Sequence, residues 1–305
     1  MKVSVIGAGN VGATLAQRIA EADIADIVLL DIAQGLAKGK GLDLSDARSI
    51  IGHDRNILGT SDYNDIADSK IVVITAGLAR QPGMTREDLV NKNTATIKKV
   101  IACICEKAPE AIIIMVTNPL DILTNIALKI SGFNHKKVIG MGGLLDSSRF
   151  ANLIAERLNA SPSEIEAMVI GAHGQSMLPL PRFTKVAGKK LTELLSQAEC
   201  EELSKDTVNR GAKIVECLGN GSAYYAPSAA AFAMVQAIVK DEKKVLSACV
   251  YLNGEYGIKD VCIGVPIILG ASGVEQIVEL ELTKQETESL VSSANAVKSA
   301  VAALS

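Results

Sequence analysis

Short apolar runs alternate with longer segments of helical period through the first half of the chain. The runs are KVSVI at 2–6, DIVLLD at 26–31, KIVVITA at 70–76 and AIIIMVT at 111–117. They are rich in Val and Ile and lack polar alternation, which is typical of strands buried on both faces. The segments between them, such as 36–50, have helical spacing. This alternation predicts βαβ units and an α/β fold with a doubly wound parallel sheet.

The pattern changes after about residue 160, where longer helices and hairpin-like strands are predicted. Besides a final helix, the predicted helices are 192–218 and 228–239, and the predicted strands are 245–252 and 261–269. Such an arrangement is typical of an α+β domain. We therefore expect two domains, residues 1–143 and 144–305. Because no stretch rich in Gly, Ser or Pro separates them, we expect them to share a substantial interface.

Composition and charge exclude two classes of partner. The formal net charge is -3 over 305 residues, whereas a nucleic-acid-binding surface needs clustered Lys and Arg. The uncharged stretch 217–239 has the length of a membrane span, but its Gly-Asn-Gly start, Pro227 and Gln236 oppose that interpretation. Its Ala-rich part predicts a closely packed helix, for which a subunit interface is one explanation. We expect neither a nucleic-acid nor a membrane partner.

The cysteines indicate a reducing compartment. All six lie in apolar or helical contexts without paired C-x-x-C spacing: Cys103, Cys105, Cys200, Cys217, Cys249 and Cys262. This usage is typical of reduced thiols in a cytosolic protein, and the spacing does not match a metal site. The N-terminal MKVSVIGAG enters a strand directly, without the apolar segment of an export signal. We expect a cytoplasmic protein without a metal.

A glycine-rich turn follows the first predicted strand. In GAGNVG, Gly7, Gly9 and Gly12 fit the G-x-G-x-x-G pattern of a Rossmann dinucleotide-binding turn, and Asp31 ends the next strand about 20 residues on. An aspartate there accepts hydrogen bonds from the ribose hydroxyls of NAD, and its charge repels the 2′-phosphate of NADP. The pattern therefore predicts NAD as the cofactor. The alternative is that Asp31 only caps a turn and the glycines only permit close packing.

Polar side chains also follow predicted strands farther along the chain. His173 lies between Gly171 and Gly174, and Asp146 and Arg149 are three residues apart at the start of a predicted helix. Imidazole exchanges protons near neutrality, and a carboxylate beside it favours the protonated ring. An arginine can hold a carboxylate ligand through two parallel hydrogen bonds. Taken singly, these residues could equally be a structural histidine and a surface ion pair.

Taken together, the motifs resemble a known family. GAGNVG, Asp31, ITAGLARQPGMTREDL, VTNPLD, DSSR and GAHG stand in the order and spacing of the NAD-dependent 2-hydroxy acid dehydrogenases that include lactate and malate dehydrogenases. The resemblance covers the whole chain, through GNGSAYYAPSAA in the second half. It implies an N-terminal Rossmann domain, an α+β substrate domain, and hydride transfer between NAD and a small 2-hydroxy acid. It also implies a homo-oligomer, either a dimer or a tetramer.

The resemblance assigns catalytic and substrate-binding roles. It implies that His173 is the acid/base and that Asp146 holds its ring and stabilises the imidazolium. Arg149 is implied to bind the carboxylate next to the reacting carbon, and Arg86 to polarise the carbonyl. Asn118 is implied to bond to the same oxygen or to place the nicotinamide. The Asn118-Pro119 bond is a candidate for the cis form.

The same resemblance implies a set of cofactor contacts. They lie in the glycine-rich turn, after the predicted strands and on the helix that begins near residue 85. The residues are Gly7, Gly9, Asn10, Val11, Gly12, Asp31, Thr75, Ala76, Gly77, Asn93, Val116 and Asn118.

The identity of residue 80, an arginine, indicates the substrate. Malate-specific members of the family carry Arg at this position and lactate-specific members usually carry Gln, so the resemblance implies malate and oxaloacetate. The physical argument agrees, because burying the second carboxylate of oxaloacetate without a cation costs several kcal/mol. With pyruvate the arginine would itself be unpaired. The alternatives are a lactate dehydrogenase, a non-catalytic NAD-binding redox sensor and, more remotely, a glycosidase of the same fold that uses NAD transiently.

Overall fold

A parallel six-stranded sheet forms the N-terminal half of the computed structural model, which describes residues 1–78 and 86–304. Its strands are β1 (Lys2–Ile6), β2 (Asp26–Leu30), β3 (Ile57–Thr60), β4 (Ile71–Ile74), β5 (Ile112–Met115) and β6 (Val138–Gly140). They run in the order β3-β2-β1-β4-β5-β6, with every neighbouring pair parallel. The predicted α/β class and doubly wound sheet are confirmed. The strand β3 is absent from the prediction.

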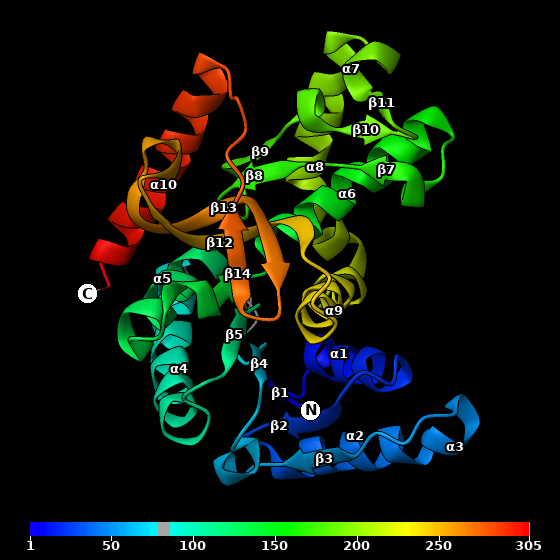
Figure 1. The fold of residues 1–305 in the computed structure, drawn as a ribbon, viewed down its shortest axis with the longest axis vertical. Helices are drawn as coiled ribbons and strands as arrows, with labels where there is room; N and C mark the ends of the chain where they lie inside the picture. The colour runs from blue at the N-terminus through cyan, green and yellow to red at the C-terminus, as the bar shows by residue number, and fades with distance from the viewer. Residues whose placement is uncertain (79–85, 305) are drawn as a thin grey trace.

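Helices cover both faces of this sheet, which explains why its strands are apolar throughout. They are α1 (Asn10–Glu21), α2 (Gln34–Asp46), α3 (Arg48–Ile51), α4 (Arg86–Lys107) and α5 (Leu120–Ser131), with the 3-10 helices η1 (Tyr63–Ile66) and η2 (His135–Lys137). Figure 1 shows α4 and α5 on one side of the sheet and α1 and α2 on the other. All four residues of β4 and of β5 are buried. Each face of the sheet therefore has its own apolar core.

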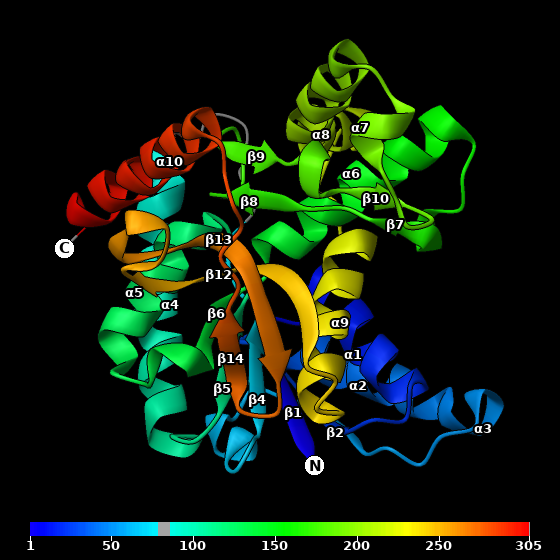
Figure 2. The same cartoon turned by 45° about the horizontal axis from the view of Figure 1, so that its top comes forward.

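The second half combines helices with antiparallel strands. Its helices are α6 (Gly142–Leu158), α7 (Leu191–Leu194), α8 (Gln197–Leu218), α9 (Tyr225–Val239) and α10 (Lys284–Ala302), with η3 (Pro162–Glu164), η4 (Pro181–Phe183) and η5 (Glu255–Gly257). Its strands are β7 (Ile165–Glu166), β8 (Val169–Gly171), β9 (Met177–Pro179), β10 (Lys185–Val186), β11 (Lys189–Lys190), β12 (Lys244–Asn253), β13 (Lys259–Gly270) and β14 (Gly273–Ile277). Figure 2 shows the long β12 and β13 beside the parallel strands.

One sheet joins the two halves. The strand β12 pairs antiparallel with β6 at Cys249 and Gly140, and the order continues through β13, β8 and β9 to give eleven strands including β14. The strands β7, β10 and β11 form a separate small sheet. The expectation that the halves share a large interface is met by main-chain pairing as well as side-chain packing. The division at residues 143 and 144 stays a prediction.

The predicted single helix at 192–218 is wrong, because the chain breaks between α7 and α8. Leu195 has extended backbone angles, and Ser196 caps α8 with a reciprocal pair of hydrogen bonds to Glu199. A Ser followed three residues later by Glu is the sequence signature of a helix start. The capping box therefore outweighs the continuous helical spacing on its two sides.

The Ala-rich helix α9 packs within its own chain. Eight of its residues, including Ala230, Ala231 and Ala237, are buried, and Figure 2 shows it between α1 and α6. Small side chains allow these helices to approach closely, so this composition has an explanation that needs no second subunit. Among the described residues, no helix is long and apolar enough to cross a membrane.

Candidate active site

The glycine-rich turn joins β1 to α1 at the carboxyl end of the sheet. Gly7 has a φ of 108°, and a Cβ atom there would lie 2.6 Å from the nitrogen of Ala76. A Cβ atom on Gly12 would overlap the carbonyl oxygen of Gly7, whereas one on Gly9 would meet nothing within 4 Å. Gly7 and Gly12 are thus required for packing. Gly9 faces open space next to the N-terminus of α1, where an anion is favoured.

Asp31 both orders this turn and faces a cavity. Its Oδ2 atom accepts the N–H of Ala8 at 2.7 Å, and its Oδ1 atom accepts the N–H of Ala33 at 2.9 Å. The turn-capping alternative therefore describes part of its role. Asp31 also lines a cavity of about 260 Å³ together with Gly9, so its charge is available to a bound nucleotide.

Apolar side chains complete this first cavity. Ile32, Leu36 and Tyr63 line it beside Asp31. Burial raises the pKa of Tyr63 to about 12, so its hydroxyl stays protonated. Flat apolar walls next to a carboxylate suit a base attached to a ribose. Sequence reasoning missed these three residues, because isolated apolar or aromatic residues after β2 and β3 carry no pattern of their own.

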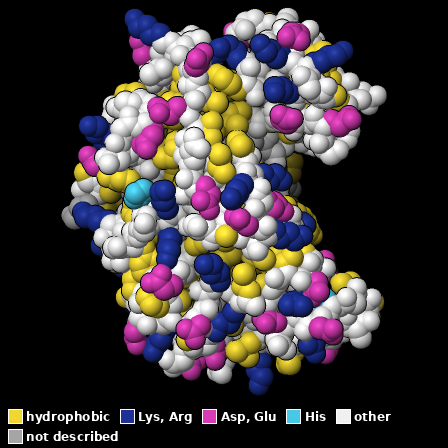
Figure 3. Space-filling view, in the orientation of Figure 1, with side chains coloured by type: hydrophobic (Ala, Val, Ile, Leu, Met, Phe, Trp, Pro, Cys, Tyr) yellow, Lys and Arg dark blue, Asp and Glu magenta, His cyan; other side chains and the backbone are white. Residues whose placement is uncertain are grey.

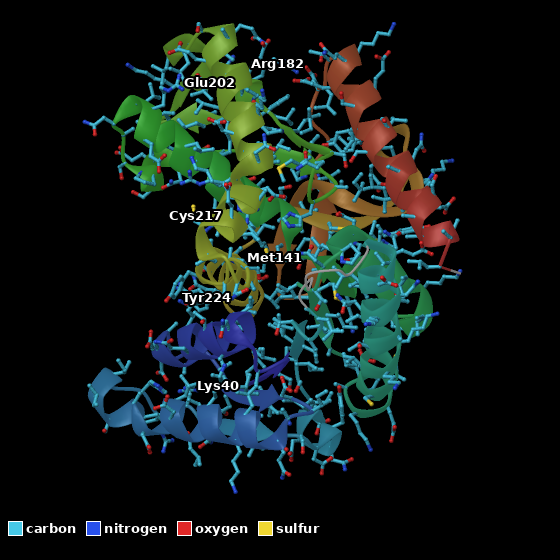
Figure 4. The ribbon with its side chains drawn as sticks, turned by 180° about the vertical axis from the view of Figure 1, so that it is seen from behind. Lys40, Met141, Arg182, Glu202, Cys217 and Tyr224 are labelled. Atoms are coloured by element: carbon cyan, nitrogen blue, oxygen red, sulfur yellow. The ribbon has the colours of Figure 1, made fainter. Side chains whose placement is uncertain are left out.

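A second cavity of about 190 Å³ adjoins the first, since both are lined by Thr75, Gly77 and Leu78. His173, Asn118 and Met141 also line it, and Figure 4 shows Met141 at the centre of the molecule between its two halves. Among the predicted cofactor contacts, the second cavity is lined by Val11, Thr75, Gly77, Val116 and Asn118, and the first by Gly7, Gly9, Asp31, Thr75, Ala76 and Gly77. The segment before α9 adds Ser222 and Ala223, and α9 itself adds Pro227. These residues belong to GNGSAYYAPSAA, which contributed to the resemblance, but sequence reasoning gave them no role.

Three predicted cofactor contacts line neither cavity: Asn10, Gly12 and Asn93. Asn10 is exposed at the start of α1, and Gly12 packs against Gly7. Asn93 is fully buried, and its amide bonds to both main-chain groups of Leu78 and to the carbonyl of Asn118. It therefore ties two cavity-lining loops together. The Asn118-Pro119 bond beside it is cis, as the sequence suggested.

Asp146 stands between His173 and Arg149. Its Oδ2 atom lies 2.8 Å from Nδ1 of His173, and its Oδ1 atom accepts a hydrogen bond from Nη1 of Arg149 at 3.3 Å. The Asp146 side chain is only 2 % exposed, and that of Arg149 only 11 %. The structure thus brings together three predicted residues from α6 and the loop after β8. Since Nδ1 faces Asp146, the Nε2 atom of His173 is the nitrogen left for a substrate.

Glycines permit this approach. Gly171 and Gly174, with φ values of 83° and 132°, bend the chain on either side of His173. A Cβ atom on Gly142 would lie 2.9 Å from the Cβ atom of His173. The start of α6 can therefore bring Asp146 against the imidazole only because residue 142 has no side chain.

The charges around His173 favour its protonated form. Burial lowers the pKa of His173, but the charge and hydrogen bond of Asp146, with the charge of Asp121, outweigh it and raise the pKa. Burial also lowers the pKa of Arg149, against the charge of Asp146. The Nε atom of Arg149 is buried with no partner in the described part of the chain. It is a donor that a ligand carboxylate could satisfy.

Two positions implied by the resemblance lack a described side chain. Arg80 lies outside the described residues. Arg86 is the first residue of α4, but its side chain lies outside them too. Across residues 1–78 and 86–304, no group of three or more His, Cys, Asp or Glu side chains could hold a metal ion.

A Rossmann turn whose cavity leads to a buried His–Asp pair and an arginine defines an NAD-dependent dehydrogenase. A family described as "lactate/malate dehydrogenase, NAD binding domain" matches residues 1–140, and its "alpha/beta C-terminal domain" matches residues 144–304. The chain belongs to the lactate/malate dehydrogenase family and is an enzyme that uses NAD.

Similar proteins carry both names of this family. A malate dehydrogenase from Methanosarcina barkeri is 52% identical over 303 residues, covering 99% of each chain. The structure of malate dehydrogenase from Salinibacter ruber is 44% identical, with a TM-score of 0.95 and coverage of 100% of this chain and 97% of that one. A lactate dehydrogenase from Cryptosporidium parvum, complexed with lactic acid and NAD, reaches a TM-score of 0.96 at 37% identity, covering 99% and 97%. The fold alone therefore does not separate the two substrates.

Proposed function

We propose that this protein is a malate dehydrogenase that interconverts malate and oxaloacetate with NAD. The observation that carries the proposal is the buried Asp146, which contacts both His173 and Arg149 beside the cavity next to the Rossmann turn. This arrangement holds a proton acceptor and a carboxylate site against the two oxygens of one aspartate. The names of the relatives at about 50% identity support the choice of malate.

His173 exchanges the proton in the proposed reaction. Its Nε2 atom takes the proton of the malate hydroxyl as the C–O bond becomes a carbonyl, and Asp146 at Nδ1 stabilises the resulting imidazolium. When bound, NAD supplies the acceptor for the hydride that leaves the hydroxyl-bearing carbon. In the reverse direction His173 returns its proton to the carbonyl oxygen of oxaloacetate. Asn118, which lines the same cavity, donates a hydrogen bond to that oxygen.

Arg149 holds the carboxylate adjacent to the reacting carbon. Its guanidinium is largely buried, and its Nε atom has no partner among the described residues, so a ligand carboxylate would satisfy a donor that is otherwise costly to bury. Arg86 polarises the carbonyl or steadies the incipient alkoxide. Arg80 pairs with the second carboxylate of oxaloacetate, and this pairing excludes pyruvate.

The proposal includes the location of the enzyme and its oligomeric state. The six unpaired cysteines support a reducing, cytoplasmic location. Exposed large apolar side chains at Leu42, Ile50, Ile51 and Leu218 support a homo-oligomer, either a dimer or a tetramer, in which some of them are covered. Light scattering on the purified protein would give the number of subunits, and a monomer at all concentrations would contradict this part of the proposal.

A paired substrate assay tests the choice of malate. We expect kcat/KM with NADH to be far higher for oxaloacetate than for pyruvate. Arg80→Gln should lower kcat/KM for oxaloacetate about a thousandfold, equivalent to ~4 kcal/mol, and change that for pyruvate little. Arg182→Gln, which alters an exposed arginine paired with Glu286, is the control. A preference for pyruvate, or equal losses with both substrates in Arg80→Gln, would contradict the assignment.

A further inference from the structure

A second buried carboxylate lies behind His173. Asp121 is the second residue of α5 and is 5% exposed. Its Oδ2 atom accepts the main-chain N–H of His173 at 2.8 Å, while its Oδ1 atom is buried and receives no N–H or O–H hydrogen bond from the described residues. The thiol of Cys249, a weak donor, is the side-chain hydrogen-bond partner of this carboxylate. A buried carboxylate oxygen without a strong donor is costly. Its presence beside the catalytic histidine therefore calls for an explanation.

The surroundings of Asp121 identify the imidazole as the group that responds to its charge. The groups that face Asp121 are His173 from the loop after β8, Asp146 from α6, and the thiols of Cys249 on β12 and Cys262 on β13. A thiol is a weak donor, and Asp146 repels Asp121. His173 is the group in this set that gains a positive charge when it binds a proton. It faces Asp146, Asp121 and the positive charge of Arg149.

We propose that Asp121 is a positioning residue of this enzyme, which fixes the main chain of His173 through Oδ2 and stabilises the protonated ring through its negative charge. The inference rests on the proposed proton exchange at His173. An interaction that strengthens when the ring is charged stabilises the protonated ring more than the neutral ring. In agreement with this role, burial raises the pKa of Asp121 while the His173 ring and N–H oppose that rise, and Asp121 in turn raises the pKa of His173.

The neighbouring residue offers a matched control. Ala172 donates its N–H to the hydroxyl of Ser293 on α10 at 3.0 Å. Ser293 therefore anchors the same loop without a charge. Removing that hydroxyl disturbs the position of the loop, whereas Asp121→Asn keeps an acceptor for the His173 N–H and removes the charge. Ser293→Ala therefore tests the position of the loop, and Asp121→Asn tests the charge.

The direct test is a titration of histidine side chains by NMR on the full-length protein. The chain has three histidines, so His173→Asn assigns the signal, and His53 and His135 serve as internal references. In Asp121→Asn we expect the midpoint of His173 to move to lower pH, by less than in Asp146→Asn, with both references unchanged. In Ser293→Ala the midpoint should stay at its wild-type pH although kcat falls. An unchanged midpoint in Asp121→Asn, or an equal shift in Ser293→Ala, would overturn the proposal.

A second variant tests the same idea with Asp121 in place. Cys249→Ser puts a strong hydroxyl donor beside the carboxylate, which should weaken the effect of its charge and move the His173 midpoint down by less than Asp121→Asn does. An unchanged midpoint would count against the proposal. The titration needs no substrate, so a wrong choice between malate and lactate would not affect it. If instead His173→Asn kept near-native turnover, the proposed function would fail while the titration result stood.

Discussion

The two cavities of this enzyme depend on different features of the chain. The first depends on main-chain shape: three glycines within six residues, the N-terminus of α1, and one carboxylate that bonds to the turn. The second contains His173 from the loop after β8, which is held from behind by carboxylates on α5 and α6. A site shaped by the main chain can therefore be recognised from one short stretch of sequence. Electrostatic sites are assembled by the fold from residues that are distant along the chain.

Removing the proton acceptor should give the largest effect, and it should change catalysis in the second cavity without changing NADH binding in the first. His173→Asn keeps a polar side chain of similar size but cannot exchange a proton near neutrality. We expect kcat to fall about a thousandfold, while NADH binding measured by fluorescence is unchanged, because the first cavity keeps all its groups. As a control, His135→Asn changes a histidine in η2 that lines neither cavity, and it should leave both quantities unchanged. Near-native turnover in His173→Asn would remove His173 from the mechanism.

Alanine substitutions in the glycine-rich turn should distinguish a glycine that is needed for packing from one that lets the cofactor approach the main chain. In Gly12→Ala the new methyl group overlaps the carbonyl of Gly7, so we expect a loss of about 1–3 kcal/mol in the free energy of unfolding. In Gly9→Ala the methyl meets no protein atom, and Gly9 has a φ of -66°, so stability should stay within about 0.5 kcal/mol. Its Kd for NADH should rise about tenfold, or ~1.4 kcal/mol.

Thermal denaturation and NADH titration of both variants measure this contrast. If Gly9→Ala were the less stable of the two, the assignment of Gly9 to ligand approach would be wrong.

A smaller effect is expected in the pH profile of kcat/KM when Asp146 loses its charge. Neutral His173 accepts the hydroxyl proton, so malate oxidation should rise with pH through the raised pKa of His173, and oxaloacetate reduction should fall over the same range. Asp146→Asn removes a charge that raises this pKa, so both profiles should move to lower pH. Profiles of kcat/KM for the two directions measure the displacement. A shift to higher pH in Asp146→Asn would contradict the electrostatic argument.

The residues that line the two cavities illustrate what the sequence could not supply. The G-x-G-x-x-G spacing and Asp31 predicted the turn and its ligand, because each residue acts within one βαβ unit. Tyr63 and Ser222 line the cavities, but Tyr63 lies in a segment without a pattern, and the motif that contains Ser222 does not assign it a contact. Only the packing of η1 and of the α8–α9 connection places them there. The Ser196 and Glu199 pair of the capping box is visible in the sequence, but the prediction of one helix over 192–218 followed the helical spacing on its two sides.

Asp121 shows the same limit within the catalytic cluster. It belongs to VTNPLD, a motif that contributed to the resemblance, yet its spacing from His173 gives no sign that the two residues touch. Asn93 likewise was assigned to the cofactor from the resemblance, whereas the structure commits its amide to the main chain of two loops.

The α/β class and the NAD cofactor followed from the sequence alone, because apolar periodicity and turn geometry are local properties, and the resemblance of its motifs supplied the reacting groups that we propose. Tertiary structure added Asp121 as a second carboxylate in contact with His173 and decided how deeply both carboxylates are buried. Burial and distance set the strength of an electrostatic interaction, and both are properties of the folded chain. Two aspartates 25 residues apart, as Asp121 and Asp146 are, act on one imidazole only once α5 and α6 have packed beside the same strand.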